Sequence, residues 1–223
     1  MSLQLYFAPG ACSFVPHVML EAAGAAFEPK MVKLHKGEQY GDDYKALNPR
    51  AQVPLLVVDQ QPISQIVAIT SFIADHFEAQ KFLPAEPLAK ARCLEALAWM
   101  NNTVHPTFTH IFMPQKYASD EAAQAAIKAH NLQLFAKQLS ELDAMVGQAK
   151  AAGGQFVATV FGHDHLTALD AYLLTFTRWG SIAGIDPTQW VHSWPHIQML
   201  AAHPAVARVI ERERLQLNMM AAQ

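Results

Sequence analysis

The stretch "PGACS" contains the first residue that could carry out chemistry, Cys12. It follows a run that alternates like a β-strand and precedes an apolar run with helical spacing, so we expect Cys12 at the start of a helix. The amides and the dipole at a helix N-terminus lower the pKa of a thiol, and the neighbouring Ser13 offers a cap or a hydroxyl donor. A small buried residue between helix and sheet fits the same pattern. Two interpretations of Cys12 therefore stay open, an activated nucleophile and a structural thiol.

The second candidate is the Val53–Pro54 peptide in "NPRAQVPLL", which precedes an apolar strand. A trans proline at this point would cost a hydrogen bond of the ladder. A cis peptide would instead turn the backbone N–H and C=O of Val53 outward, ready to pair with an extended peptide ligand. Only about 5% of X-Pro bonds are cis, so the spacing does not decide between the two forms.

The remaining histidines and the second cysteine suggest less chemistry. His163, Asp164 and His165 lie close together in "GHDHL", but no third and fourth ligand follow at a fixed spacing, so we expect a polar loop and no metal. Cys93 lies within a helical pattern and is expected to be structural. His17, one helical turn after Cys12, is expected to be a partly exposed helix residue rather than a base.

The first eighty residues show the pattern of a small α/β layer. Extended runs are "LQLYF", "FEPKMVKL", "VPLLVVD" and "QQPIS", and helical runs are "FVPHVMLEAAG" and "IVAITSFIADHF". The order β-α-β, a loop with a short helix, and then β-β-α fits a thioredoxin-like sheet.

A proline-rich segment, "FLPAEPLAK", ends this pattern, and the rest of the chain has almost no strand signals. We expect a thioredoxin-like domain at 1–80, a linker at 81–87 and an all-helical domain at 88–223. "LDAYLLTFTRW" is apolar on most sides and predicts a central, buried helix. Thr167 and Asp170 in "TALD" form a capping-box pattern at its start, which is a folding device and not a catalytic group.

Composition excludes several classes of partner. Hydrophobic residues make up 52% and charged residues 16% of the chain, and the formal net charge is -3, so neither nucleic acid nor an anionic membrane is an expected partner. The apolar stretches are shorter than the roughly 20 residues that span a bilayer. The two cysteines are distant in sequence, and no basic residue precedes Lys30 as a signal peptide would require. We therefore expect free thiols and a cytoplasmic location.

Four segments resemble the cytosolic glutathione transferases: "YFAPGACS", "LNPRAQVPLL", "SQIVAITSFIAD" and "LTALDAYLLTFTRW". The cysteine in the first segment is similar to that of the bacterial beta class. The resemblance implies a thioredoxin-like domain followed by an all-helical domain that carries the electrophile pocket and the dimer contacts. It implies a homodimer, glutathione as co-substrate, and attack of the glutathione thiolate on a small apolar electrophile.

The resemblance also implies catalytic residues. Cys12 would face the glutathione sulfur, with the Ser13 hydroxyl beside it. Tyr6 matches the tyrosine before the active-site turn of the family. His105 matches a beta-class histidine that approaches the sulfur from the helical domain.

Glutathione-binding residues follow from the same resemblance. Val53 would pair with the cysteinyl backbone of glutathione at the Pro54 turn. Gln65 and the backbone N–H of Ile66 would hold the γ-glutamyl carboxylate at a helix N-terminus. His35 lies near the position of a family lysine that reaches the glycine end.

The chain departs from the family at three of these places. Ile66 replaces a serine or glycine, removes a hydroxyl and is expected to narrow the γ-glutamyl pocket. His35 replaces the lysine, so its charge is partial near neutral pH. Pro106 follows His105 where the beta class often has lysine, and it is expected to kink the helix.

Three functions remain open from the sequence. The preferred one is conjugation of glutathione to apolar electrophiles, the detoxification chemistry of the family. A glutathione-dependent thiol–disulfide oxidoreductase would use Cys12 itself as the nucleophile. A non-catalytic protein of the same fold would bind apolar ligands or other proteins, which the altered residues Ile66 and Pro106 would suit.

Overall fold

The computed structural model describes residues 1–220, which form two compact units. The first unit contains Met1–Leu83 and Leu200–Leu215, and the second contains Pro84–Met199 and the segment that begins at Gln216. The sequence placed everything after the linker in one helical domain, so the return of Leu200–Leu215 to the first unit was not expected.

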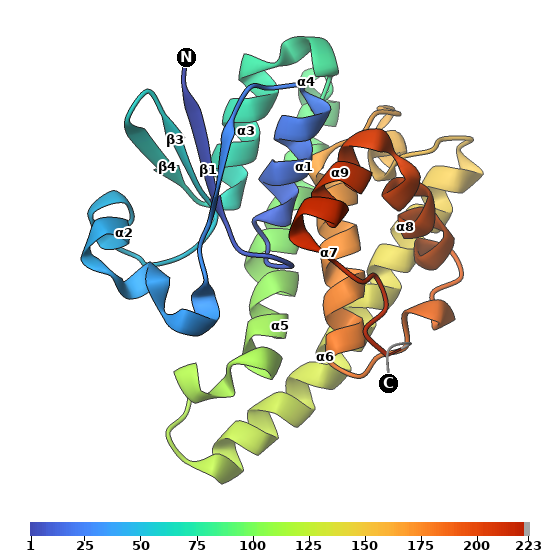
Figure 1. The fold of residues 1–223 in the computed structure, drawn as a ribbon. Coiled ribbons are helices and arrows are strands. Elements are labelled where there is room, and N and C mark those ends of the chain that lie inside the picture. The colour runs from blue at the N-terminus through green and yellow to red at the C-terminus, as the bar shows by residue number, and fades with distance from the viewer. Residues whose placement is uncertain (221–223) are drawn as a thin grey trace. The chain divides into compact units, whose positions relative to one another are not determined.

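A four-stranded sheet forms the centre of the first unit (Figure 1). Its strands are β1 (Leu3–Phe7), β2 (Glu28–Met31), β3 (Leu55–Val58) and β4 (Gln61–Ser64), in the order β2-β1-β3-β4. β1 is parallel to β2 and antiparallel to β3, and β4 is antiparallel to β3. The predicted thioredoxin-like arrangement is confirmed.

Proline lies in both edge strands of this sheet, Pro29 in β2 and Pro62 in β4. A proline has no N–H to offer to a further strand, so both edges resist pairing with another chain. The edge strand in which β4 places Pro62 is one where a proline is tolerated.

The helices of the first unit are α1 (Phe14–Ala22), α2 (Asp42–Leu47), α3 (Ile66–His76) and α9 (Pro204–Glu213). Successive side chains of β1 point to opposite faces of the sheet. Phe7 meets His17 of α1, with ring centroids 4.8 Å apart, whereas Tyr6 meets Tyr44 of α2 at 5.6 Å. Helix α2 therefore lies on the face opposite to α1. Figure 1 shows α1 beside α9, the C-terminal helix.

The second unit contains α4 (Pro87–Trp99), α5 (His105–Phe112), α6 (Glu121–Ala151) and α7 (Ala168–Ile182), and α8 spans Ser193–Ala202. Almost every residue of α7 is buried, as its apolar composition predicted. Tyr172 and Phe176 of α7 are fully buried, and so is Phe135 of α6. Within the described part of the chain, every helix is too short or too polar to cross a lipid bilayer.

Pro106 does not break the helix in which it lies. A π-helical turn at Met100–Val104 joins α4 to α5, so the helical backbone is continuous from Pro87 to Phe112. The backbone N–H of His105 donates to the Met100 carbonyl, five residues back, instead of four. The wider turn accommodates the proline ring and its missing N–H, and the kink expected at Pro106 stays a prediction.

The capping box at the start of α7 has the contacts that its sequence predicts. The Thr167 hydroxyl accepts a hydrogen bond from the Leu169 N–H at 3.2 Å, and the Asp170 carboxylate accepts one from the Thr167 N–H at 2.9 Å. Asp170 is fully buried and also accepts from the Val157 N–H at 2.9 Å and contacts His196 Nε2 at 3.2 Å. The carboxylate therefore joins three separate segments of the second unit.

Removing this carboxylate is expected to cost more than removing an ordinary cap. Thr167→Ala should lower the free energy of unfolding by about 1 kcal/mol. Asp170→Ala should lower it by about 3 kcal/mol, because it leaves two buried amides without an acceptor. Asp120→Ala, which removes the exposed cap of α6, is the matched control and should cost at most about 1 kcal/mol. Urea unfolding followed by circular dichroism measures all three, and equal costs for Asp170→Ala and Asp120→Ala would contradict the assignment.

Candidate active site

The turn before α1 explains why a Pro-Gly pair precedes the cysteine. The Ala11 N–H donates to the Ala8 carbonyl at 3.1 Å, which closes a four-residue turn with Pro9 and Gly10 in the middle. Gly10 has φ +69°, the value that a type II turn requires at its third residue and that glycine adopts without steric cost. Cys12 follows this turn directly.

Cys12 lies beside the backbone of Val53. Its Sγ donates to the Val53 carbonyl oxygen at 3.6 Å, and the side chain is only 8% exposed. The Val53–Pro54 peptide is cis. The structure thus brings together two candidates that are forty-one residues apart in sequence.

The Cys12 thiol is protonated rather than activated. Burial raises its pKa to about 12, and this outweighs the lowering by the backbone N–H groups of Cys12 and Ser13. The amides of Phe14 and Val15 already donate to the carbonyls of Ala11 and Cys12. Of the two interpretations of Cys12, the raised pKa favours the structural thiol over the activated nucleophile.

Ser13 closes the turn and does not cap the helix. Its hydroxyl accepts from the Ala8 N–H at 3.1 Å and donates to the Ala8 carbonyl at 3.2 Å. The side chain is fully buried, and no cap hydrogen bond is formed. The one proton of the hydroxyl goes to the Ala8 carbonyl, so Ser13 holds the turn closed, and its contact with a ligand sulfur stays a prediction.

Tyr6 and His35, two further predicted site residues, lie in β1 and in a 3₁₀ turn of the first unit. The Tyr6 ring packs with Tyr44 on the face of the sheet opposite to α1, and its catalytic role stays a prediction. His35 is exposed in a short 3₁₀ turn at Leu34–Lys36, from which it can meet a ligand from solvent.

The segment before Val53 is held by α2. The Tyr44 hydroxyl and the Asn48 side-chain amide each donate to the Gln52 carbonyl at 2.7 Å. Burial raises the pKa of Tyr44 to about 12, so its hydroxyl keeps the proton that it donates. Two donors on one carbonyl fix the backbone immediately before Val53.

The N-terminus of α3 provides a place for an anion. The first amides of a helix have no partner within it and lie at the positive end of the dipole. Gln65 precedes them, is exposed, and has φ +76° and ψ 127°, a conformation that costs a non-glycine residue about 1–3 kcal/mol. Ile66 is only 3% exposed, because its side chain packs into the core. The narrowing of the γ-glutamyl pocket expected from Ile66 stays a prediction.

Glu213 is the residue of this region that the sequence reasoning missed. Its side chain is fully buried, and it accepts from the Gly10 N–H at 2.8 Å and pairs with His17 Nδ1 at 2.7 Å. His17 is fully buried as well, contrary to the exposed position expected for it. The signal was available, because Glu213 continues the apolar stripe of α9 through Val206 and Val209.

Arginine and a second glutamate complete this contact between α1 and α9. Arg212 Nη1 donates to His17 Nε2 at 2.9 Å and also pairs with Glu21, which Arg208 contacts at 2.8 Å. Since Nε2 accepts from Arg212, the proton of the neutral imidazole lies on Nδ1 and is donated to Glu213. His17 is thus committed to structure and is no base for Cys12.

His105 belongs to the second unit and is half-buried at the start of α5. Its Nδ1 lies 2.7 Å from the Tyr172 hydroxyl, and its ring lies edge-on to Trp179, with centroids 5.0 Å apart. Burial lowers the pKa of His105 to about 4. The imidazole is therefore neutral at physiological pH.

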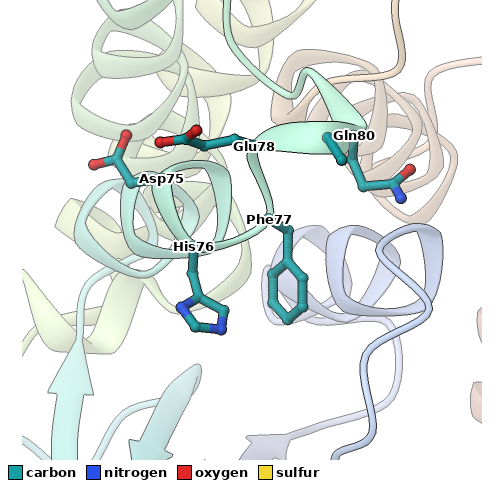
Figure 2. A pocket seen from close by; sticks show the side chains of 6 residues that line it. Asp75, His76, Phe77, Glu78 and Gln80 are labelled. Atoms are coloured by element: carbon teal, nitrogen blue, oxygen red, sulfur yellow. The ribbon is translucent and has the colours of Figure 1, made fainter.

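A surface hollow at the C-terminal end of α3 is separate from these residues (Figure 2). It is lined by Asp75, His76, Phe77, Glu78, Ala79 and Gln80. The His76 ring stacks on Phe72 at 5.7 Å, and in Figure 2 it points away from the carboxylates of Asp75 and Glu78. No residue that the sequence selected lines this hollow. Among residues 1–220, no group of His, Cys, Asp and Glu side chains has the arrangement of a metal site.

Comparison with known proteins identifies the family. A model described as "Glutathione S-transferase, N-terminal domain" matches residues 1–75. "Glutathione S-transferase GST-4.5" of Xanthomonas campestris pv. campestris is 32% identical over 187 residues, which cover 82% of this chain and 85% of that protein. The chain belongs to the glutathione S-transferase family.

Other relatives of this transferase-family chain match over nearly its full length. "Glutathione S-transferase GstA" of Escherichia coli O157:H7 is 28% identical over 216 residues, which cover 96% of this chain and 100% of that protein. The solved structure of a sphingomonad glutathione S-transferase complexed with glutathione is 29% identical, has a TM-score of 0.78 and matches 96% of this chain and 100% of that one. A shorter match is the maleylpyruvate isomerase of Ralstonia sp, 28% identical over 109 residues and about half of each chain, 48% and 51%. The relatives thus include transferases and an isomerase.

The raised pKa of Cys12 predicts the pH dependence of its alkylation. With a pKa of about 12, the thiolate fraction is about 10⁻⁴ at pH 8 and grows about tenfold with each pH unit. The rate of modification by iodoacetamide, followed by mass spectrometry of the Cys12 peptide, should therefore rise without a plateau from pH 7 to 10. Cys93, whose pKa burial also raises to about 12, is the internal comparison. A plateau for Cys12 at or below pH 8 would show that the thiol is activated after all.

The buried position of Glu213 predicts a large loss of stability on its removal. Glu213→Ala leaves the Gly10 N–H and the His17 Nδ1–H without their acceptor and should lower the free energy of unfolding by about 2–4 kcal/mol. Glu211→Ala, at an exposed position on the same helix, should change it by less than about 0.5 kcal/mol. Thermal and urea unfolding of the two variants provide the measurement, and a difference below about 1 kcal/mol would refute the assigned role.

Proposed function

We propose that this protein is a glutathione-dependent transferase that joins the glutathione sulfur to small apolar electrophiles. The observation that carries the proposal is the position of the Cys12 thiol, 3.6 Å from the Val53 carbonyl, in a chain of the glutathione S-transferase family. Glutathione would extend along the Val53 backbone, with its sulfur next to Cys12.

The N-terminus of α3 supports the other end of this ligand. The γ-glutamyl carboxylate would lie against the amide of Ile66 and the side chain of Gln65, at the positive end of the helix dipole. The exposed His35 would reach the glycine end. Backbone donors provide most of this site, so the absence of a hydroxyl at Ile66 weakens glutathione binding without removing it.

Protonation favours glutathione over Cys12 as the nucleophile. A thiol with a pKa of about 12 is ionised to only about 10⁻⁵ at pH 7, so Cys12 is a poor attacking group and a good hydrogen-bond donor. On binding, its one S–H proton would leave the Val53 carbonyl, which accepts it in this structure, and be donated to the glutathione thiolate. The same property argues against the thiol–disulfide oxidoreductase that uses Cys12.

The reaction follows from that arrangement. The glutathione thiol loses its proton, which passes to solvent, and the sulfur forms a bond to the electrophilic carbon. The leaving group departs with the electron pair, or an activated double bond takes up a proton instead. A donor that stabilises the thiolate raises its fraction at neutral pH, which is the main catalytic effect required.

Aromatic side chains of the second unit support an apolar electrophile. Trp179, Phe108 and Phe112 form a nearly parallel stack, with centroids 4.5 Å and 5.6 Å apart. Phe112 at the end of the stack is 61% exposed. An exposed aromatic face on an ordered stack favours a flat, apolar partner. His105 lies edge-on to Trp179 in the same unit, and its contact with the sulfur stays a prediction from the family resemblance.

We further propose a cytoplasmic homodimer, as the resemblance to the family implies. Light scattering coupled to size-exclusion chromatography measures the mass in solution. A mass near that of one 24.6 kDa chain at micromolar concentration would refute the dimer.

Calorimetry and one pair of variants test the function. Wild-type protein should bind glutathione, and Cys12→Ser should keep conjugation of a nitro-activated aryl halide within about tenfold, because a serine hydroxyl also donates a hydrogen bond. Cys93→Ser is the control for cysteine loss as such. A loss of more than about a thousandfold in Cys12→Ser alone would make Cys12 the nucleophile. No heat with glutathione at millimolar concentration would favour the non-catalytic alternative.

A further inference from the structure

We propose that the Cys12 thiol makes the site of the first unit prefer a glutathione thiolate over the thioether that the reaction forms, because its single proton has two alternative acceptors. One acceptor is the Val53 carbonyl, which holds the proton in this structure, and the other is the ligand sulfur. The position of the ligand rests on the proposed function. The first premise, a thiol proton held by a backbone carbonyl, is a property of the free protein.

The contact between Cys12 and Val53 has a defined direction. The Cys12 Sγ lies 3.6 Å from the Val53 carbonyl oxygen, and a hydrogen bond from sulfur is longer than one from oxygen because sulfur is larger. A carbonyl oxygen only accepts, so the thiol is the donor. Burial raises the pKa of Cys12 to about 12, so the thiol keeps its proton near neutral pH. A single S–H can be directed at one of two acceptors at a time.

The carbonyl is held in place from both sides along the chain. The preceding carbonyl, of Gln52, accepts from the Tyr44 hydroxyl and from the Asn48 side-chain amide, both at 2.7 Å. Two residues after Val53, strand β3 begins at Leu55 and pairs with β1. A ligand amide that pairs with the Val53 carbonyl therefore meets an oxygen that already accepts the Cys12 proton.

The thiol is held as closely as the carbonyl. The Gly10 N–H is bound by the buried Glu213 carboxylate at 2.8 Å, and the Ser13 hydroxyl closes the turn on Ala8. The Cys12 side chain is 8% exposed. Changing the acceptor requires only rotation of the S–H about the Cβ–Sγ bond, which moves no heavy atom.

The charge of the ligand sulfur decides where this proton goes. A thiolate is an ionised acceptor, and hydrogen bonds to ionised groups are about twice as strong as neutral ones. The S–H then turns from Val53 to the thiolate and leaves the carbonyl to the ligand amide. A thioether sulfur is a weak, neutral acceptor. With a thioether the S–H stays on the Val53 carbonyl, where it competes with the ligand amide.

The two effects have opposite signs and different sizes. The bond to the thiolate should raise the affinity for ionised glutathione about tenfold. The competition at Val53 should lower the affinity for a thioether only about twofold to threefold, because a carbonyl oxygen has two lone pairs and an S–H is a weak donor. The preference for the thiolate is the product of the two factors.

The proposed reaction removes the charge on which this preference depends. When the sulfur forms its bond to carbon, the negative charge leaves the sulfur with the departing group, or is neutralised by the proton that the activated double bond takes up. The Cys12 proton then returns to the Val53 carbonyl. Cys12 keeps this proton in every state, so it acts as a specificity residue that contacts the ligand sulfur and forms no bond to it.

Calorimetry with two ligands tests the preference at pH 9.5, about one unit above the usual pKa of a thiol. Cys12→Ala should weaken the binding of glutathione about tenfold and strengthen the binding of S-methylglutathione about twofold to threefold. Cys12→Ser, whose hydroxyl is also a single donor, should keep the wild-type preference. Cys93→Ala removes the other buried thiol and should change neither affinity.

The opposite signs distinguish this role from a general disturbance of the site. A cavity or a displaced turn in Cys12→Ala would weaken both ligands together. Changes of the same sign for the two ligands, or no change for either, would overturn the proposal.

Infrared spectra of the S–H stretch test the premise. The chain has two cysteines, so the Cys93→Ala protein has one S–H band, that of Cys12. In the free protein this band should lie at lower wavenumber than that of an unbonded thiol. S-methylglutathione has no S–H and should leave the band close to that position, whereas ionised glutathione should lower it further. An unbonded band in the free protein, or the same shift with both ligands, would show that the proton does not change its acceptor.

The measurements separate this inference from the proposed function. No heat with either ligand would overturn the function, and the preference that rests on it falls as well, whatever the position of the infrared band. If glutathione binds and is conjugated but both ligands respond alike to Cys12→Ala, the function stands and the role of the Cys12 proton is wrong.

Discussion

The buried carboxylate of Glu213 is the interaction on which the geometry around Cys12 depends. A charge away from water is tolerated only when donors surround it, and here the donors are the Gly10 N–H and the His17 imidazole. Gly10 belongs to the turn that presents Cys12, and Glu213 belongs to the last helix of the unit. The hydrogen bond between Glu213 and Gly10, which are 203 residues apart in sequence, therefore holds the four-residue turn before Cys12 in place. Because the carboxylate also lies near the thiol, it helps to raise the pKa of Cys12.

Cys12 and His105, two side chains for which chemistry is expected, are both uncharged near neutral pH. Cys12 keeps its proton, and His105 does not acquire one, in both cases because burial disfavours the ion. The negative charge of the reaction would thus arrive on the ligand, as the thiolate and the carboxylates of glutathione.

In the first unit, buried side chains hold the loops in place, and backbone groups are left to bind a ligand. Ser13 closes the Ala8 turn, and Tyr44 with Asn48 holds the carbonyl before Val53. These three side chains already form hydrogen bonds with the protein backbone. The Val53 backbone and the first amides of α3 are the groups that we expect a peptide ligand to contact. The substitutions at His35 and Ile66 affect the periphery of this surface more than its centre, because Ile66 turns its side chain into the core.

The sequence by itself determined the local structure of this protein. Alternation in "LQLYF", the Pro-Gly turn, the capping box of Thr167 and Asp170, and the apolar composition of α7 each depend on residues within a few positions of one another, and each is present as expected. The resemblance carried in four such segments also identified the family. Only the tertiary structure decided which side chains are ionised and which groups they contact. The pKa of Cys12, the burial of His17 and Glu213, the inward turn of Ile66 and the π turn around Pro106 depend on which distant segments exclude water and supply hydrogen bonds. Solvation and long-range packing have no period in the chain, so a pattern of residue types cannot encode them locally.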